Sequence, residues 1–168
     1  MARNELGYSL VELLVVSSLL LLLLLGVSTL FIASLTADAR ITLRQELRAE
    51  GNYALDSMSY FIRNAKAIPV CVSNGSTLSV LNEDGRVTEY YLSSNQIASH
   101  SAALAPFPER TDLLTVLPYE VETGSFVLDC NNVNQPYITI SFTLTRTDSQ
   151  GTAIENAFRH TVLVRNQL

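Results

Sequence analysis

The stretch GYSLVELLVVSSLLLLLLLGVSTLFIASLTADAR, residues 7–40, decides the fold. Between Leu13 and Ala37 it contains no charged side chain. About 20 apolar residues are enough to span the ~30 Å hydrocarbon core of a bilayer as a helix. We therefore expect this segment to enter a membrane, and the feature to explain is Glu12 at its start.

Two general membrane roles compete for this segment. A secretory signal has a basic start, an apolar core of about 7–15 residues and a small-x-small cleavage site. Ala37-Asp38-Ala39 offers such a site, but the apolar run is longer, and Arg3 in the leader is offset by Glu5. A permanent single-pass anchor explains the length. With such an anchor, Glu12 would be a hydrated residue at the membrane interface, since inserting a carboxylate deeper into the bilayer costs about 2.5–3.5 kcal/mol.

A third interpretation rests on resemblance. The prepilin processing site of type IV pilins and type II secretion pseudopilins resembles this start position by position, at Gly7, Tyr8, Ser9, Leu10, Val11 and Glu12. The resemblance implies that a membrane-embedded prepilin peptidase cuts after Gly7 and methylates the new amino terminus at Tyr8. The departure from the family pattern is Tyr8, where Phe is commoner.

The resemblance also implies a role for Glu12. In a filament whose core is made of such apolar helices, its carboxylate would be buried among neighbouring subunits. A buried charge is tolerated only when it is paired. The free amine at Tyr8 of an adjacent subunit is the expected partner, and the pair would set the register between subunits.

Composition limits the rest of the chain. With 168 residues and 48% hydrophobic content, there is room for one compact domain outside the membrane. From Asp38 onward ten Lys and Arg stand against fourteen Asp and Glu, a balance of −4. Nucleic-acid binders usually carry a basic patch and a high pI. We therefore expect no direct nucleic-acid binding.

The two cysteines, Cys71 and Cys130, both follow the apolar run. A domain carried across a membrane meets an oxidising compartment, so we expect a disulfide between them. The alternative is two separately buried thiols. The sequence has no CxxC or His-Cys cluster, so no metal site is expected.

Apolar residues continue at helical spacing beyond the membrane segment, from Leu43 to Ala65. We expect one helix from Tyr8 to Ala67, ending before Pro69 because the residue before a proline avoids the α region. Gly51 lies inside this helix, where glycine is tolerated but lowers helix stability by about 1 kcal/mol relative to alanine.

The remainder has the pattern of β-structure. A hairpin is predicted from Leu78 to Leu92 around the turn Asn82–Gly85. Residues 137–147 alternate apolar and hydroxyl side chains, which predicts a strand with one wet face. Further strands are expected at Leu113–Leu117, Phe126–Leu128 and Thr161–Val164, and the stretch between the hairpin and Leu113, with two prolines, is read as a surface loop.

The expected fold class is therefore α+β, a pilin-like long helix packed on an antiparallel sheet. The predicted divisions are a leader at 1–7, a transmembrane or filament-core helix at 8–37, its amphipathic second half at 38–68 and an extracytoplasmic β domain at 69–168. The closing segment FRHTVLVRN resembles the larger minor pilins and J-type minor pseudopilins, whose last strand ends in Arg-Asn, here after Thr161 at Arg165 and Asn166.

Catalytic chemistry is not expected. His100 and His160 lack a nucleophile or acid at a recognisable spacing, and no phosphate-binding loop occurs. The turns at 82–85 and 129–134 contain the Asn, Asp and Gly that ordinary turns need, so no calcium site or other cofactor is predicted.

The sequence thus predicts a structural subunit of a type IV pilus or type II secretion pseudopilus. Its expected partners are prepilin peptidase, other pilin or pseudopilin subunits, the inner-membrane assembly platform and, before assembly, membrane lipid. It would lie in the bacterial inner membrane with the domain outside, and then in the filament. The alternative is a membrane-anchored extracytoplasmic binding domain that does not polymerise.

Overall fold

The computed structural model describes residues 9–71, 75–104, 106, 108–131 and 137–165. They form one long helix, α1 (Leu10–Arg63), followed by nine strands. The strands are β1 (Ala67–Cys71), β2 (Leu78–Leu81), β3 (Val87–Ser93), β4 (Gln96–Ser101), β5 (Arg110–Leu113), β6 (Glu120–Val121), β7 (Val127–Asn131), β8 (Tyr137–Thr147) and β9 (Ala153–Leu163). The chain divides into two compact units between Ile41 and Thr42, and α1 contributes to both.

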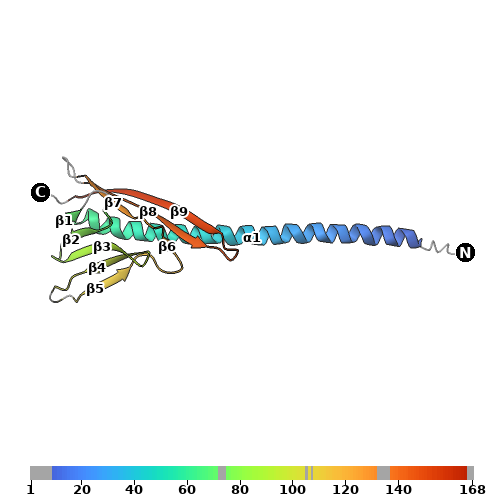
Figure 1. Cartoon of the computed structure of the whole chain (residues 1–168), viewed down its shortest axis with the longest axis horizontal. Coiled ribbons are helices and arrows are strands. Elements are labelled where there is room, and N and C mark those ends of the chain that lie inside the picture. Colours follow the sequence, from blue (N-terminus) through green and yellow to red (C-terminus); the bar gives the residue numbers. More distant parts are fainter. Residues whose placement is uncertain (1–8, 72–74, 105, 107, 132–136, 166–168) are drawn as a thin grey trace, which may run out of the picture. The chain divides into compact units, whose positions relative to one another are not determined.

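The second unit holds all nine strands and the end of α1, which runs along the strands in Figure 1. Strands β1 to β5 form an antiparallel sheet in chain order. In the second sheet β8 is central, because β9 pairs with it from Tyr137 to Thr147 while β7 and β6 pair with its two halves. A bridge between Gly75 and Leu128 joins the two sheets.

One hydrophobic core lies between α1 and both sheets. The helix contributes fully buried side chains from one face, at successive spacings of seven, four and four residues, namely Leu47, Ala54, Met58 and Ile62. Buried residues at alternate positions come from the strands, among them Tyr90 in β3 and Phe142 in β8. The α+β class with a long helix on antiparallel strands is therefore confirmed.

Two predicted patterns are confirmed in detail. Strands β2 and β3 pair across the turn at 82–85, where Gly85 has φ +83°. In β8 the apolar residues Ile138, Ile140, Phe142 and Leu144 are buried. Both patterns depend on contacts between near neighbours in the sequence, because a hairpin turn and strand alternation are local properties.

The end of the helix was predicted too late. Helix α1 stops at Arg63, and Ala67 begins β1, so Pro69 lies inside a strand rather than just after the helix. Strand β1 is an edge strand, and its pairing with β2 shifts register between Ala67 and Val70. Proline is tolerated at such an edge or bulge because its missing N–H breaks no regular ladder.

Other strand predictions were displaced or incomplete. The strand expected at Leu113–Leu117 is β5, which ends where that range begins. The stretch interpreted as a loop contains β4, which includes His100 and lies between β3 and β5. The strands expected at 126–128 and 161–164 are parts of β7 and of the much longer β9. One sheet was expected, and the described strands form two.

Candidate functional site

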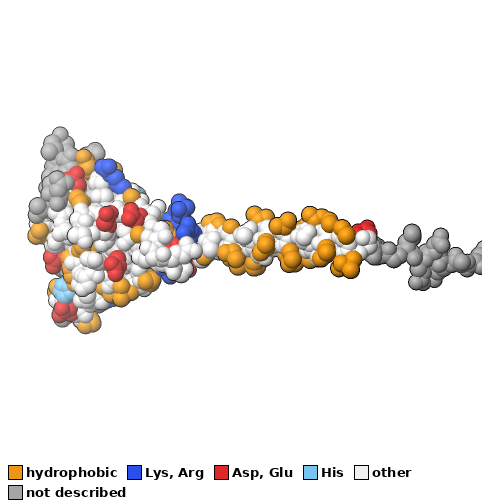
Figure 2. Space-filling model, turned by 45° about the vertical axis from the view of Figure 1, so that its right-hand side comes forward, with side chains coloured by type: hydrophobic (Ala, Val, Ile, Leu, Met, Phe, Trp, Pro, Cys, Tyr) orange, Lys and Arg blue, Asp and Glu red, His pale blue; other side chains and the backbone are white. Residues whose placement is uncertain are grey.

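The apolar half of α1 is exposed on all sides. Every large hydrophobic side chain from Leu10 to Leu35 is between 51% and 78% exposed, and hydrophobic side chains cover this segment in Figure 2. It is the helix in the described part of the chain that is long and apolar enough to cross a membrane. So large a continuous apolar surface requires lipid or protein to cover it.

Five hydroxyl groups of this segment are paired inside the helix. Ser17, Ser18, Ser28, Thr29 and Thr36 each donate to a backbone carbonyl three or four residues earlier, at 2.8–2.9 Å. In an apolar environment an unpaired hydroxyl is costly. These side chains therefore do not oppose placing the segment in lipid or among other helices.

Glu12 lies in the first turn of α1, and its side chain is exposed. Ser9 begins the helix, because its hydroxyl accepts from the backbone N–H of Val11 at 3.3 Å and its carbonyl accepts from the N–H of Leu13 at 3.2 Å. Ser9 and Glu12 thus have the spacing of a capping box. An acid in this turn also interacts favourably with the helix dipole. A capping role is therefore a local alternative for Glu12 that the sequence analysis did not consider.

Gly7 and Tyr8 lie outside the described residues. Cleavage after Gly7 and methylation at Tyr8 therefore stay predictions, as does the ion pair between Glu12 and the Tyr8 amine of a neighbour. The same holds for Asn166 and for residues 132–134 of the second turn that was considered for calcium.

Cys71 and Cys130 form the predicted disulfide, with their Cα atoms 6.1 Å apart. It joins β1 to β7 through two cysteines that are 59 positions apart in the sequence. Together with the Gly75–Leu128 bridge, it holds the two sheets together. The bond is structural in position, because it links the edges of the two sheets.

A cluster of polar side chains links α1 to β8 and to the residue before β6. Arg146 Nη1 of β8 donates to Glu46 Oε2 at 2.6 Å and to the Tyr119 hydroxyl at 2.7 Å. The Tyr119 hydroxyl itself donates to Glu46 Oε2 at 3.0 Å, and the guanidinium carbon of Arg146 lies 5.0 Å from the centroid of the Tyr119 ring. Burial, followed by the hydrogen bond to Glu46, raises the pKa of Tyr119. The neighbouring Glu50 accepts from the backbone N–H of Val116 at 2.8 Å.

No sequence signal pointed to this cluster. Glu46 is separated from Tyr119 by 73 residues and from Arg146 by 100. The Glu46 carboxylate, the Arg146 guanidinium and the Tyr119 hydroxyl hydrogen-bond to one another in a partly exposed position. Such an arrangement is typical of a structural contact. We assign it to positioning the helix on the sheets.

Within the described part of the chain, the remaining titratable groups form no recognisable catalytic arrangement. His100 contacts Thr111 Oγ1 through Nδ1 at 3.1 Å and Glu109 through Nε2 at 3.4 Å, both near the surface. His160 lies in β9. Among the residues that the structure describes, no three His, Cys, Asp or Glu side chains are grouped so that they could share a metal ion.

Comparisons with protein-family models, with curated proteins and with solved structures found no significant match to this chain.

Proposed function

We propose that this chain is a prepilin-like subunit, of the minor pilin or pseudopilin type, of a type IV pilus or type II secretion pseudopilus. Prepilin peptidase would process it after Gly7, and its apolar helix would then leave the inner membrane for the core of a filament. Its role would be structural rather than catalytic. It would associate with other pilin or pseudopilin subunits and the inner-membrane assembly platform, and with lipid before assembly.

The observation that carries the proposal is the contrast within α1. Up to Leu35 the helix exposes its apolar side chains in every direction, whereas from Leu47 one face is buried in the domain core. A permanent anchor needs the first property and leaves the acid at the start of the apolar run with no more than a local role in the first turn of the helix. A filament core gives that acid a partner, since a buried carboxylate requires a cation.

Orientation is argued from the disulfide. Arg40, Arg44 and Arg48 follow the apolar run and only Arg3 precedes it, which by the positive-inside rule would favour a cytoplasmic domain. Disulfides are rare in the reducing cytosol. We give the Cys71–Cys130 bond more weight, because a covalent bond persists only where the compartment allows it. We therefore propose that the domain lies outside the cytoplasm.

The test of processing is mass spectrometry of the N-terminal peptide from the native host. The proposal predicts a chain that begins at Tyr8 with one added methyl group. Gly7→Val should abolish cleavage, because a branched side chain blocks the close backbone approach that glycine permits. A mature protein that begins at Met1, or at a residue near Ala39, would contradict the proposal.

The second candidate is a single-pass anchored binding domain that does not polymerise. The exposed apolar helix fits it equally well, because lipid alone would cover that surface. Retention of residues 1–7 in the mature protein, with a disulfide intact, would favour this candidate.

A further inference from the structure

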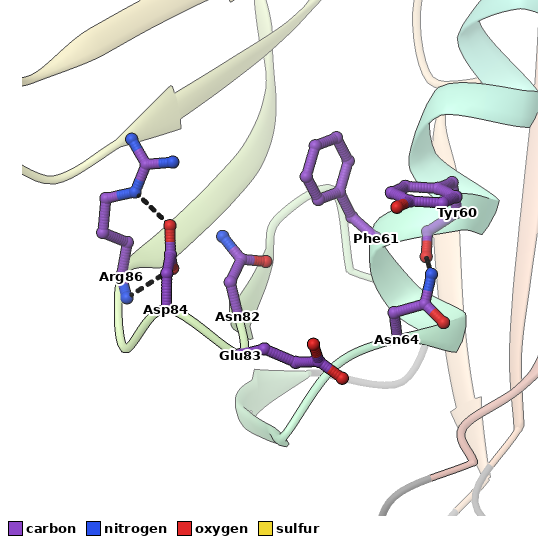
Figure 3. Close-up of a pocket in the computed structure, with 7 residues that line it drawn as sticks. All are labelled: Tyr60, Phe61, Asn64, Asn82, Glu83, Asp84 and Arg86. Atoms are coloured by element: carbon purple, nitrogen blue, oxygen red, sulfur yellow. Dashed lines mark hydrogen bonds and ion pairs between the residues drawn. The ribbon is translucent and has the colours of Figure 1, made fainter. Parts of the chain in front are cut away.

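A groove in the second unit separates α1 from the five-stranded sheet. Its first part is a pocket of about 370 Å³, which Figure 3 shows between Tyr60 and Phe61 of the helix and the β2–β3 turn carrying Asn82 and Arg86. The two aromatic rings meet edge to face, with centroids 5.5 Å apart, and remain 65% and 39% exposed as residues.

A second pocket of about 280 Å³ continues from the first, and both share Phe61, Asn82 and Arg86. Its helix wall also includes Tyr53 and Ser57, which lie on the same face of α1 because four and eight residues separate Tyr53 from Ser57 and Phe61. The opposite wall is formed by β3, β4 and β5. The groove therefore has an aromatic side, on the helix, and a sheet side.

The sheet side is rich in hydroxyl groups. The side-chain amide of Asn82 donates to Thr88 Oγ1 at 2.8 Å, and Thr88 Oγ1 lies 2.8 Å from Ser101 Oγ. Tyr90 lines the same pocket, is fully buried, and has a hydroxyl without a hydrogen-bond partner in the described residues. A buried hydroxyl without a partner is costly. A bound polar group would relieve that cost.

Most charges that line the groove are paired with each other. Arg86 Nε lies 2.6 Å from Asp84 Oδ2, and Arg110 Nε lies 2.6 Å from Asp112 Oδ2. The hydrogen bonds from Arg86 hold the pKa of Asp84 below its usual range, so this carboxylate stays ionised and paired at neutral pH. Among the described residues that line the groove, Glu83 is the one remaining charged side chain; it is exposed and forms no ion pair with them. A strongly charged ligand is therefore disfavoured.

We propose that this groove binds a neutral carbohydrate, with one face of a sugar ring against Phe61 and Tyr60 and its hydroxyls on the sheet side. Aromatic rings supply apolar contact for the C–H face of a sugar, while hydroxyl and amide groups can both donate to and accept from its hydroxyls. This inference is independent of filament assembly, because the groove lies wholly in the second unit.

The test is titration of the full chain, in a detergent without a sugar headgroup, with maltotriose, cellotriose and triacetylchitotriose. The peptide Gly-Ser-Gly serves as a polar probe of another class. Calorimetry gives the Kd, and ¹H–¹⁵N chemical shifts locate the ligand. We expect at least one trisaccharide to bind with a Kd in the millimolar range or tighter and to shift the amides of Thr88, Ser99 and Ser101.

Three variants locate the site. Phe61→Ala, at an exposed position, should raise the Kd about tenfold, equivalent to about 1.4 kcal/mol. Tyr90→Phe should raise it several-fold. The matched control is Tyr91→Phe, because Tyr91 lies next in β3 and therefore on the opposite face of the sheet; its Kd should not change. Thermal unfolding of each variant confirms that the domain is folded.

The proposal is overturned if no trisaccharide binds at tens of millimolar, or if Gly-Ser-Gly binds more tightly than every sugar. It is also overturned if the Kd of Phe61→Ala equals that of the unmodified chain, since the ligand would then lie elsewhere.

Discussion

Gly51 lies where α1 meets the aromatic side chains of the second sheet. A Cβ atom at this position would collide with the ring of Phe158, which stacks on Phe142 with centroids 5.1 Å apart. The sequence analysis treated Gly51 as a tolerated but unfavourable residue of the helix. The structure shows a packing reason for glycine at this position. The absence of a side chain allows the helix and the Phe158 ring to approach each other.

We predict that Gly51→Ala destabilises the domain. Alanine favours the helix by about 1 kcal/mol over glycine, but overpacking a filled core costs typically about 1–3 kcal/mol. Since Phe158 is only 7% exposed and held by Phe142, it has little room to move. The measurement is the free energy of unfolding in urea.

Gly26→Ala is the matched control, because a Cβ on Gly26 in the same helix meets no atom within 4 Å. It should leave the stability of the domain unchanged. If Gly51→Ala instead raises stability, as a simple helix-propensity gain would, the packing role of Gly51 is wrong.

Tyr90 makes stability depend on pH at the alkaline end. Burial raises the pKa of its hydroxyl well above the ordinary value of 10. A group whose pKa is raised in the folded state contributes its stability below the unfolded pKa and loses it as pH rises toward the folded pKa. The domain should therefore lose stability progressively above about pH 10.

Tyr90→Phe should flatten this alkaline decline and leave stability at pH 7 equal or higher, because an unpaired buried hydroxyl costs about 1–3 kcal/mol. Unfolding in urea at pH 7 and at pH 10.5 measures both effects. Tyr91→Phe is the control. A marked loss of stability in Tyr90→Phe at pH 7 would mean that the hydroxyl has a partner after all.

At the scale of secondary-structure elements, those with a repeating residue pattern could be predicted from the sequence. The helix followed from its apolar run and from buried residues at helical spacing, and β8 followed from alternation. Strand β4 was missed because its residues Gln96, Ala98, Ser99 and His100 are not typical strand formers. They form a strand because β3 and β5 pair on either side of them.

The hairpin formed by β3 and β4 was missed for a related reason, because its turn also lacks the residues that such turns usually carry. Its two-residue turn is Ser94-Asn95, with φ +49° and +60° at the two positions. Positive φ at both central residues is the geometry of a type I′ turn, which usually carries Asn-Gly or Asp-Gly. Without a glycine, the turn gave no strong sequence signal.

The disulfide belongs to the same scale, since it joins β1 to β7. It closes a loop across 59 residues, which corresponds to about 4 kcal/mol in the chain-entropy model. Replacing both cysteines with serine should lower the free energy of unfolding by up to that amount. Urea unfolding with and without reductant provides the measurement, and reductant should have no effect on the variant.

Peptide mapping of the native protein without reductant checks both the bond and the compartment. Recovery of a Cys71–Cys130 peptide is expected. Quantitative labelling of two free thiols in the native protein would contradict the bond and remove the argument for an extracytoplasmic domain.

At the scale of the whole molecule, the sequence indicated the two cysteines and Glu12 but not the cluster of Glu46, Tyr119 and Arg146. The cysteines are recognisable by type, and Glu12 stands out against an apolar background. The cluster brings together ordinary polar residues 27 to 100 positions apart. Only the folded chain places such residues side by side, so no local pattern could reveal them.

The central claim is that Glu12 pairs with the Tyr8 amine of a neighbouring subunit. Its capping position offers a competing local role, and two variants separate the roles. Glu12→Gln keeps a side chain that suits a capping box but removes the charge, whereas Glu12→Leu removes both. Each variant is first checked for cleavage after Gly7, so that a processing defect is not mistaken for an assembly defect.

The decisive measurement is the ratio of correctly processed Glu12→Gln protein in sheared filaments to that in the membrane, relative to the unmodified chain. Loss of one member of a buried ion pair costs about 3–5 kcal/mol, and about 1.4 kcal/mol is a tenfold change. We expect incorporation to fall by about two orders of magnitude or more, as for Glu12→Leu. Normal incorporation of processed Glu12→Gln would contradict the ion pair, and an effect of Glu12→Leu alone would leave Glu12 as a capping residue.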